Sequence, residues 1–135
     1  MSPRRVYNHK SKEDEKEEQV YLTPASIKDN YEGWFDPCPH PRPSWDGLEV
    51  SWGLKTFVNP PWRRIRPWVA KAIAERDAGK MVHMLLPASP NVRIFHDLIF
   101  PEASEVTWIR GDTPYTRVSD GKIVKLGSCL VKFEP

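Results

Sequence analysis

The tetrapeptide Asn59-Pro60-Pro61-Trp62 follows directly after the strand-like run 54–58 and precedes a helical pattern. Neither proline can donate a backbone hydrogen bond, and neither fits the interior of a helix or a central strand. The segment therefore presents acceptors, because the Asn59 side-chain oxygen and the Pro60 carbonyl can both receive hydrogen bonds from one NH₂ group. Trp62 adds a flat face on which a ring can stack. This combination suits an exocyclic amine on a planar ring.

Accepting both N–H bonds of such an amine makes its nitrogen lone pair available for attack on an electrophile. The position of the motif fits a binding role, because ligands of open α/β sheets bind beyond the carboxyl ends of the strands. A structural turn around a buried tryptophan is the alternative interpretation of the same four residues.

Three arginines, Arg63, Arg64 and Arg66, follow the motif at once, and Arg42 precedes it in a proline-rich segment. Together they could contact the phosphates on either side of a bound base. The alternative is a solvated helix start. Cations are unfavourable near a helix N-terminus, which favours an external anion as the reason for their presence.

The elements that must position these residues can be predicted from local patterns. Apolar residues recur at three and four from 64 to 78, which predicts a helix that begins near Arg66 with Pro67 in its first turn and Gly79 just past its end. The continuous apolar run 80–88 predicts a central parallel strand covered on both faces. We expect a second helix over 91–100, stopped by Pro101, a strand over 105–111, a hairpin around Asp120-Gly121 and a final strand over 127–134.

Upstream of the motif, Thr23 and Pro24 read as the N-cap and first residue of a short helix through Tyr31. Residues 33–38 read as a buried strand ending at Asp36-Pro37, and 39–46 as an irregular loop. Strand, helix, strand, helix, strand and then antiparallel strands predict an α/β fold, a βαβ core with an antiparallel edge. Trp34, Trp68 and Trp108 are expected in the core, Trp45 in a pocket wall, and His83 as a hydrogen-bonded core histidine.

Bulk composition narrows the class of protein. Residues 1–19 hold five Lys/Arg and five Asp/Glu with almost nothing to bury, so we expect a disordered charged tail before one domain over 20–135. No apolar run approaches the ~18 residues of a membrane span, and no secretory signal is visible, which predicts a cytoplasmic protein. The two cysteines, Cys38 and Cys129, lack paired zinc spacing, so no metal site is expected.

The chain resembles the phage-type DNA N6-adenine methyltransferases, the Dam family, over roughly 21–133. The resemblance rests on the motif at 59–62, the Thr-Pro at 23–24, Phe-Asp-Pro-Cys at 35–38, Trp-Asp-Gly-Leu at 45–48 and Leu-Leu-Pro-Ala-Ser at 85–89. Trp68-x-x-Lys71-Ala72, the Trp-Ile-Arg-Gly at 108–111 and the closing stretch 128–134 continue it. It implies a reduced Rossmann-like sheet flanked by helices, S-adenosylmethionine as cofactor, and DNA as partner in a bacterial or phage-infected cell.

The resemblance also implies roles for individual residues. Asn59, Pro60, Pro61 and Trp62 would form the catalytic motif that grips a target adenine, either flipped out of a duplex or already single-stranded. Asp36-Pro37-Cys38 would lie against the methionine part of the cofactor, beside Tyr21, Thr23 and Pro24, with Asp46 near the cofactor adenine. Arg42, Arg63, Arg64 and Arg66 would contact DNA. Neither a metal nor a covalent intermediate is implied.

The chain departs from the family pattern after Asp36-Pro37-Cys38, where it lacks a Gly-x-Gly loop. A helix, a second strand and a ribose-binding acid are compressed into 39–52, where Glu49 could replace that acid. A target-recognition domain is not apparent, so a minimal enzyme, a homo-oligomer or a member without cofactor binding remain open. The same motif also serves enzymes that methylate RNA bases, cytosine N4 or glutamine amides. A nucleic-acid or partner-binding member without catalysis is the alternative from another class.

Overall fold

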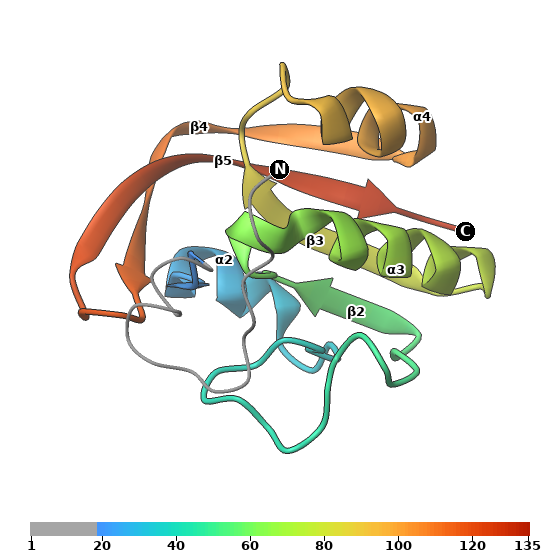
Figure 1. The fold of residues 1–135 in the computed structure, drawn as a ribbon, viewed down its shortest axis with the longest axis horizontal. Helices are drawn as coiled ribbons and strands as arrows, with labels where there is room; N and C mark the ends of the chain where they lie inside the picture. The colour runs from blue at the N-terminus through green and yellow to red at the C-terminus, as the bar shows by residue number, and fades with distance from the viewer. Residues whose placement is uncertain (1–18) are drawn as a thin grey trace, which may run out of the picture.

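The computed structural model describes residues 19–135, so the predicted tail lies outside the described residues except for Gln19. One curled sheet carries helices on both faces (Figure 1). In chain order the elements are β1 (Tyr21–Leu22), α2 (Ala25–Lys28), η1 (Asp29–Tyr31), β2 (Lys55–Val58), η2 (Trp62–Arg64), α3 (Ile65–Asp77), β3 (Met81–Pro87), η3 (Phe95–Ile99), α4 (Phe100–Glu102), β4 (Glu105–Arg117) and β5 (Ile123–Phe133).

The sheet has five strands in the order β1-β4-β5-β3-β2. β2 and β3 are parallel and are joined by α3, whereas β3 pairs with β5, β5 with β4 and β4 with β1 in antiparallel fashion. The predicted α/β class, with a βαβ unit and an antiparallel extension, is confirmed. β3 is central, as predicted, but only one of its two neighbours is parallel to it. The reduced Rossmann-like interpretation stays a prediction.

Helix α3 has the predicted place and phase. It covers Ile65–Asp77 with Pro67 in its first turn, where the missing N–H has no helical partner to lose. Its buried side is formed by Trp68, Val69 and Ala72, of which the last two have no exposed surface. Gly79 follows the helix with a φ of +97°, the left-handed conformation that ends helices at glycine.

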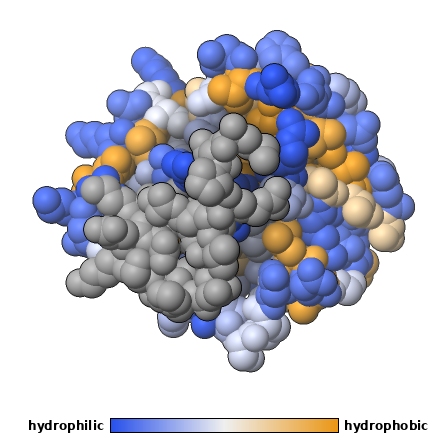
Figure 2. All heavy atoms as spheres, in the orientation of Figure 1, coloured by the Kyte–Doolittle hydropathy of each residue, from blue (hydrophilic) through white to orange (hydrophobic). Residues whose placement is uncertain are grey.

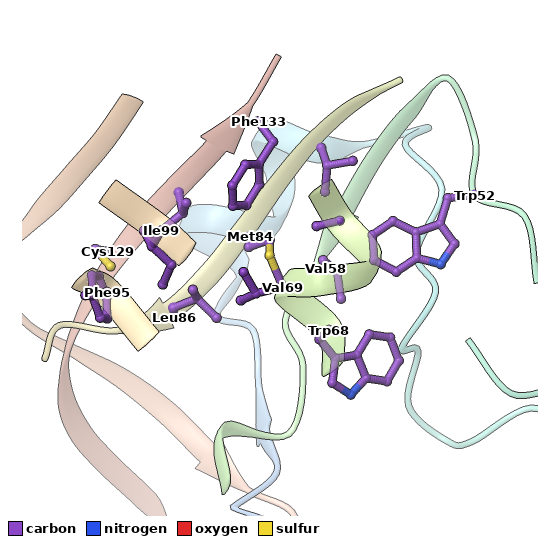
Figure 3. Close-up of a cluster of buried hydrophobic side chains, with 13 residues drawn as sticks. Trp52, Val58, Trp68, Val69, Met84, Leu86, Phe95, Ile99, Cys129 and Phe133 are labelled. Atoms are coloured by element: carbon purple, nitrogen blue, oxygen red, sulfur yellow. The ribbon is translucent and has the colours of Figure 1, made fainter. Parts of the chain in front are cut away.

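Strand β3 is buried on both faces, as its apolar run predicts. On one face Met84 and Leu86 pack with α3 and η3 in a cluster that also holds Trp68, Phe95 and Phe133 (Figure 3). On the other face Leu85 packs with the residues of a second cluster, which are Ile27, Phe57, Trp62 and Tyr115. Alternate residues of a strand point to opposite faces, so one seven-residue segment supports both clusters.

The β4–β5 pair forms the predicted hairpin around Asp120-Gly121. The Arg117 N–H donates to the Lys122 carbonyl at 2.8 Å, and Gly121 takes a φ of +73° in the turn. Between Trp108 and Asp112 the register shifts at a bulge, where Gly111 also has a φ of +73°. A bulge bends and twists its strand, and the pair curls strongly beyond this point (Figure 1). The curl brings the distal end of β4 to β1.

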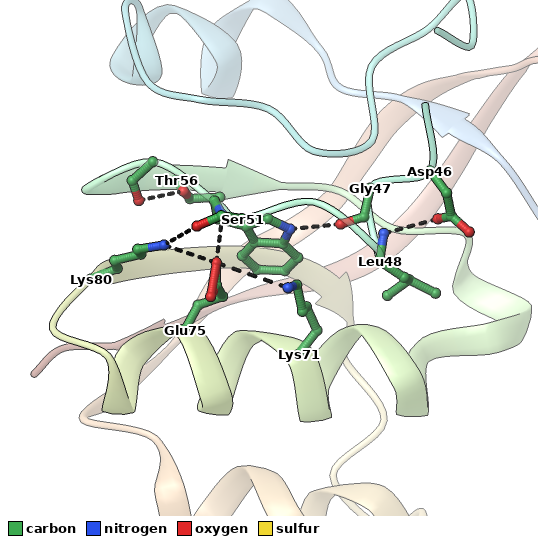
Figure 4. A network of polar contacts seen from close by, with 10 residues as sticks. Asp46, Gly47, Leu48, Ser51, Thr56, Lys71, Glu75 and Lys80 are labelled. Atoms are coloured by element: carbon green, nitrogen blue, oxygen red, sulfur yellow. Dashed lines mark hydrogen bonds and ion pairs between the residues drawn. The ribbon is translucent and has the colours of Figure 1, made fainter. Parts of the chain in front are cut away.

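Glu75 on α3 ties the loop before β2 to the helix (Figure 4). Its carboxylate accepts a short hydrogen bond from the Trp52 N–H and lies 3.1 Å from Lys80 Nζ, which also reaches Ser51 Oγ at 2.7 Å. Burial alone raises the pKa of Glu75, but these hydrogen bonds and the charges of Lys71 and Lys80 outweigh it and lower the pKa. The carboxylate therefore stays ionised inside the fold.

Several local predictions are wrong. Residues 33–38 form no strand, because only Phe35 bridges to Thr56. Thr23 does not cap a helix: Pro24 is the N-cap residue of α2, and its carbonyl accepts from Ile27 and Lys28. Trp108 is 46% exposed, because its ring stacks on Phe95 at the margin of the core rather than inside it. Pro101 lies within α4, in its first turn, instead of stopping the helix before it.

The surface seen in the view of Figure 1 is mostly hydrophilic, with small separate apolar patches (Figure 2). Of the exposed apolar side chains, Leu54 lies just before β2 and Ile123 is the first residue of β5. Within residues 19–135 there is no helix with the length and apolar character needed to cross a membrane.

We predict that Glu75→Gln lowers the free energy of unfolding by about 1–3 kcal/mol, because Lys71 and Lys80 lose their anionic partner in a buried setting. Urea unfolding followed by circular dichroism measures the change. Asp112→Asn, which removes an exposed carboxylate from β4, serves as the control and should unfold at the wild-type midpoint. Equal midpoints for both variants would show that the network contributes nothing to stability.

Candidate functional site

Two neighbouring cavities lie beyond the carboxyl end of β2. The first, here called the Asn59 pocket, has a volume of about 570 Å³ and takes its name from the first residue after β2. Its walls come from β1, the α2–η1 segment, the loop that follows, and Phe57. The residues predicted from the sequence that line it are Tyr21, Thr23, Asp36, Cys38, Arg42, Asn59 and Pro61.

Asn59 is held in place by hydrogen bonds from its side-chain amide to β1 and the residue after it. Its Nδ2 donates to the Tyr21 carbonyl at 2.7 Å and to Thr23 Oγ1 at 3.1 Å. β1 and β2 are the two opposite edges of the sheet, so this amide spans the gap that the curl leaves between them. Thr23 thus positions Asn59 rather than capping a helix.

Trp62 closes the motif from inside. Its Nε1–H donates to Asn59 Oδ1 at 3.0 Å, and its indole is only 8% exposed. The edges of the Tyr21 and Tyr115 rings pack against it with centroid distances of 5.2 and 5.1 Å. A buried indole needs an acceptor for its N–H, and the motif itself supplies one.

The four residues of the motif, 59–62, differ in whether they line the two cavities. Trp62 lines neither cavity, so its indole face presents no open plate in this conformation. Pro60 is buried and also lines neither cavity, whereas Pro61 lines both. The Asn59 oxygen keeps a second lone pair, because a carbonyl oxygen accepts two hydrogen bonds and Trp62 uses one.

The second cavity, here called the Trp45 pocket, has a volume of about 430 Å³. Trp45 is 39% exposed and packs in stacked orientation on Phe35 at 6.0 Å, which confirms its predicted place in a pocket wall. Asp46 Oδ1 accepts from the Leu48 N–H at 2.9 Å, which fixes the turn at the pocket floor. The predicted residues that line this pocket are Pro37, Cys38, Arg42, Asp46, Pro61 and Arg64.

Gly47 allows the short loop 39–52 to pack closely enough to form a wall of the Trp45 pocket. Its carbonyl accepts from Trp52 Nε1 at 2.7 Å, and a Cβ built on it would lie 1.8 Å from the Pro37 carbonyl oxygen. Only glycine therefore allows the loop to close on Pro37. The role of Gly47 was not predicted from the sequence, although its place in a tryptophan-flanked loop was visible.

The two cavities share a partition, which is made by Cys38, Pro39, Arg42 and Pro61. One elongated ligand, or two ligands in contact, could therefore occupy both. Cys38 at this partition has its backbone N–H bound to Asp36 Oδ1 at 2.9 Å, so the Asp36-Pro37-Cys38 turn faces both cavities. Pro24, also predicted for the cofactor site, lines neither cavity.

The four predicted arginines divide into two groups. Arg42 and Arg64 line the cavities, while Arg63 and Arg66 are exposed beside them. Arg66 lies 3.6 Å from Asp97, an ion pair in which both side chains are about half exposed. Solvent screens such a pair, so it does not compete strongly with a phosphate.

An aromatic group at the back of the Asn59 pocket was missed. Tyr31 stacks on Phe57 with a centroid distance of 4.1 Å, and Trp34 packs edge-on against Tyr31 at 4.9 Å. Trp34 is half-buried and lines the pocket, so the prediction that it belongs to the core holds only in part. The spacing of Tyr31 and Trp34 three residues apart was the available signal.

His83 lies behind these rings on β3 and is 8% exposed. Its Nδ1 is 2.9 Å from the Tyr31 hydroxyl, in line with the predicted hydrogen-bonded core histidine. Burial and the nearby Lys132 lower the pKa of His83, against a smaller opposing effect of Glu134 and Glu105. The ring is therefore neutral at pH 7. Among residues 19–135, no group of three or more His, Cys, Asp or Glu side chains is arranged to hold a metal ion.

A model of the DNA N-6-adenine-methyltransferase (Dam) family matches residues 42–128, which is more than half of the chain and includes Gly47 and Asn59–Trp62. Neither the curated proteins nor the solved structures contain a significant match.

We predict that Gly47→Ala lowers the free energy of unfolding by about 1–3 kcal/mol, because its methyl group would collide with the Pro37 carbonyl. Gly127→Ala is the matched control, since a Cβ there would meet the Ala88 methyl group at 3.8 Å and Asp112 Oδ1 at 4.0 Å, both ordinary van der Waals contacts. Urea midpoints of the two variants measure the difference. A Gly47→Ala midpoint equal to that of Gly127→Ala would mean that the loop is free to move away from Pro37.

Proposed function

Because the chain belongs to the DNA N-6-adenine-methyltransferase (Dam) family, we propose that it transfers the methyl group of S-adenosylmethionine to the N6 amine of adenine in DNA. One observation carries the proposal. The side chain that would accept the amine hydrogens, Asn59, lines the same cavity as Thr23 and Asp36, which would lie beside the methionine part of the cofactor. Nucleophile and methyl donor would thus meet inside one enclosure.

The charges of the Asn59 pocket suit this cofactor. S-adenosylmethionine carries a sulfonium, an ammonium and a carboxylate. Asp29, Glu32 and Asp36 offer anions in the pocket, and Lys28 and Arg42 offer cations. When bound, the cofactor supplies an electrophilic methyl group on sulfur. We assign its methionine part to the Asn59 pocket, near Tyr21, Thr23 and Asp36.

The adenosine part of the cofactor fits the Trp45 pocket. An adenine ring can stack on the exposed side of Trp45, and Asp46 lines the same wall. The partition at Cys38 and Pro61 is the point at which a molecule would pass from one cavity to the other. The loop 39–52 would thus provide the wall for the adenosine part of the cofactor that a helix and a second strand provide in the family pattern.

Asn59 would act by holding the amine. With Nδ2 committed to Tyr21 and Thr23, its oxygen has one fixed direction, and its second lone pair is available to an amine N–H. Fixed acceptors orient the nitrogen for in-line attack without reorganisation during the reaction. Trp62 supports this orientation from behind, and a stacking role would require its indole to turn outward.

DNA would approach over the arginines. Arg42 and Arg64 at the cavities and Arg63 and Arg66 beside them can contact phosphates on either side of the reacting nucleotide. A base in a duplex cannot reach an enclosed site, so the adenine would be flipped out or already single-stranded.

A second function, binding without catalysis, is favoured by one specific observation. The Trp62 indole is packed inward, and its N–H already donates to Asn59 Oδ1, the oxygen that a target amine would need as an acceptor. Titration calorimetry with S-adenosylmethionine separates the two. Heat of binding is expected for the enzyme, and no binding at millimolar cofactor would favour the non-catalytic member.

We predict that wild-type protein converts adenine in DNA to N6-methyladenine and that Asn59→Ala lowers the rate at least ~100-fold, since it removes the amine acceptor. Methyl transfer from labelled cofactor is measured on duplex and single-stranded DNA, on RNA, and on DNA in which N6-methyladenine replaces adenine. Asn30→Ala, which changes an exposed asparagine outside both cavities, is the control.

Asn59→Ala also removes hydrogen bonds to β1, so its fold is checked by circular dichroism and its cofactor affinity by calorimetry. A folded Asn59→Ala protein that binds cofactor and methylates DNA at the wild-type rate would place the chemistry elsewhere. Label transferred to RNA but not to DNA would reassign the substrate and leave the site in place.

A further inference from the structure

We propose that Tyr31, His83 and Glu134 form a proton relay that carries the proton released by the methylated amine from the Asn59 pocket to solvent. This inference rests on the proposed function and adds to it a route for the proton. Methylation of an NH₂ group leaves a nitrogen with one proton too many, and none of the residues of the motif can take it. Asn59, Pro60 and Trp62 have no basic atom.

The geometry supplies a chain of three groups. Tyr31 is among the residues that line the Asn59 pocket, and its hydroxyl is 2.9 Å from His83 Nδ1. On the far side of the imidazole, His83 Nε2 is 3.6 Å from Glu134 Oε1. The Glu134 side chain is 45% exposed, so the chain runs from the cavity wall through the sheet to water.

His83 is in a setting that packing alone does not explain. Its Nε2 is buried and, among the described residues, has no partner at normal hydrogen-bond distance, since Glu134 Oε1 lies 3.6 Å away. A buried polar atom without a partner costs free energy, so its presence calls for a reason. On the same face of the sheet, Phe57 and Leu85 pack as apolar side chains, and an apolar residue at 83 would fit that face. Proton transfer is a function that would explain an imidazole at this position.

The protonation states favour transfer in one direction. Burial raises the pKa of Tyr31, against a smaller effect of Lys132, so its hydroxyl stays protonated and donates to His83. The neutral His83 ring accepts at Nδ1, and this tautomer, assigned from the hydrogen bond, carries its own proton on Nε2. Nε2 then points its proton towards the Glu134 carboxylate.

The charges around His83 promote release after transfer. Lys132 is paired with Glu105 at 2.9 Å on the neighbouring strands and lies close enough to disfavour an imidazolium. Glu134 and Glu105 favour it more weakly, and Tyr31 is the titratable group on the pocket side. On the β2 side, Lys55 lies over the Trp34 ring at 5.8 Å. A protonated His83 is thus a short-lived carrier.

The amine nitrogen forms a bond to the methyl carbon, and the carbon–sulfur bond breaks with its electron pair left on sulfur. The nitrogen then gives one N–H proton to the Tyr31 oxygen, directly or through one water, while the Tyr31 proton moves to His83 Nδ1. His83 gives its Nε2 proton to Glu134 and solvent. The net products are a methylamine, a neutral thioether and one proton.

Two substitutions test the relay in single-turnover methyl transfer. Tyr31→Phe keeps the ring that stacks on Phe57 and removes the hydroxyl, and His83→Gln keeps hydrogen bonding without a titratable ring. We expect each to slow transfer at pH 7.5 at least ~10-fold with cofactor affinity unchanged within about threefold. His96→Gln is the matched control, because it makes the same change at an exposed histidine on η3 that lines neither cavity.

The pH profile separates a relay from a structural role. In wild type only neutral His83 can accept, so the rate should fall about tenfold per unit as pH drops through its pKa, which lies below the ordinary value of 6.5. His83→Gln should abolish this acid limb, and His96→Gln should retain it. Wild-type rates and an unchanged limb in both relay variants would overturn the relay while the proposed function stood.

A second measurement does not depend on activity. Nitrogen-15 NMR of imidazole-labelled protein at pH 7 reports the protonation state of His83. The relay requires a neutral ring with its proton on Nε2, and a doubly protonated ring or a proton on Nδ1 would overturn it. Absence of methyl transfer by the wild type would instead overturn the proposed function, and the relay with it.

Discussion

The side-chain amide of Asn59 is the contact on which the rest of the site depends. β1 and β2 are the two edges of the sheet, and nothing in their pairing brings them together. The bulge at Gly111 bends β4 until its far end delivers β1 beside β2, and the Asn59 amide then joins Tyr21 and Thr23 across the remaining gap. The Asn59 pocket is the space enclosed by that closure, so the residue proposed to hold the substrate also holds the walls.

This double use explains the inward position of Trp62. Asn59 Oδ1 would be a half-buried acceptor with little water to satisfy it, and the indole N–H satisfies it from the protein side. The Tyr21 and Tyr115 rings hold the indole there, which ties β1 and β4 to the motif. The same set of contacts therefore orients the Asn59 amide and closes the sheet. The cost is that the flat face expected to receive a ring is covered.

The sequence predicts what is local and misses what is tertiary. Pro67, Gly79 and the three-and-four spacing between them specify α3, and the apolar run after it specifies a strand covered on both faces. Trp108 was assigned to the core because its neighbours are apolar, but it packs on Phe95 only at the margin of the core and stays 46% exposed. Residues 33–38 look like a strand in isolation, yet the prolines around them leave only Phe35 to pair with β2. The pairing of Tyr31 with His83, 52 residues apart, has no local signal at all.

The compressed loop 39–52 shows how a short chain can keep two cavities side by side. A helix and strand would present a wall by burying one face, whereas this loop is fixed from outside by Glu75 through Trp52 and from inside by Gly47 against Pro37. A short loop is then enough to form the wall, because its anchors lie on α3 or next to β2. The unit made of α3 and β2 also carries Asn59. Changes in that unit move both cavities together, so the distance between a ligand in one and a ligand in the other is set by α3 and β2 rather than by the loop itself.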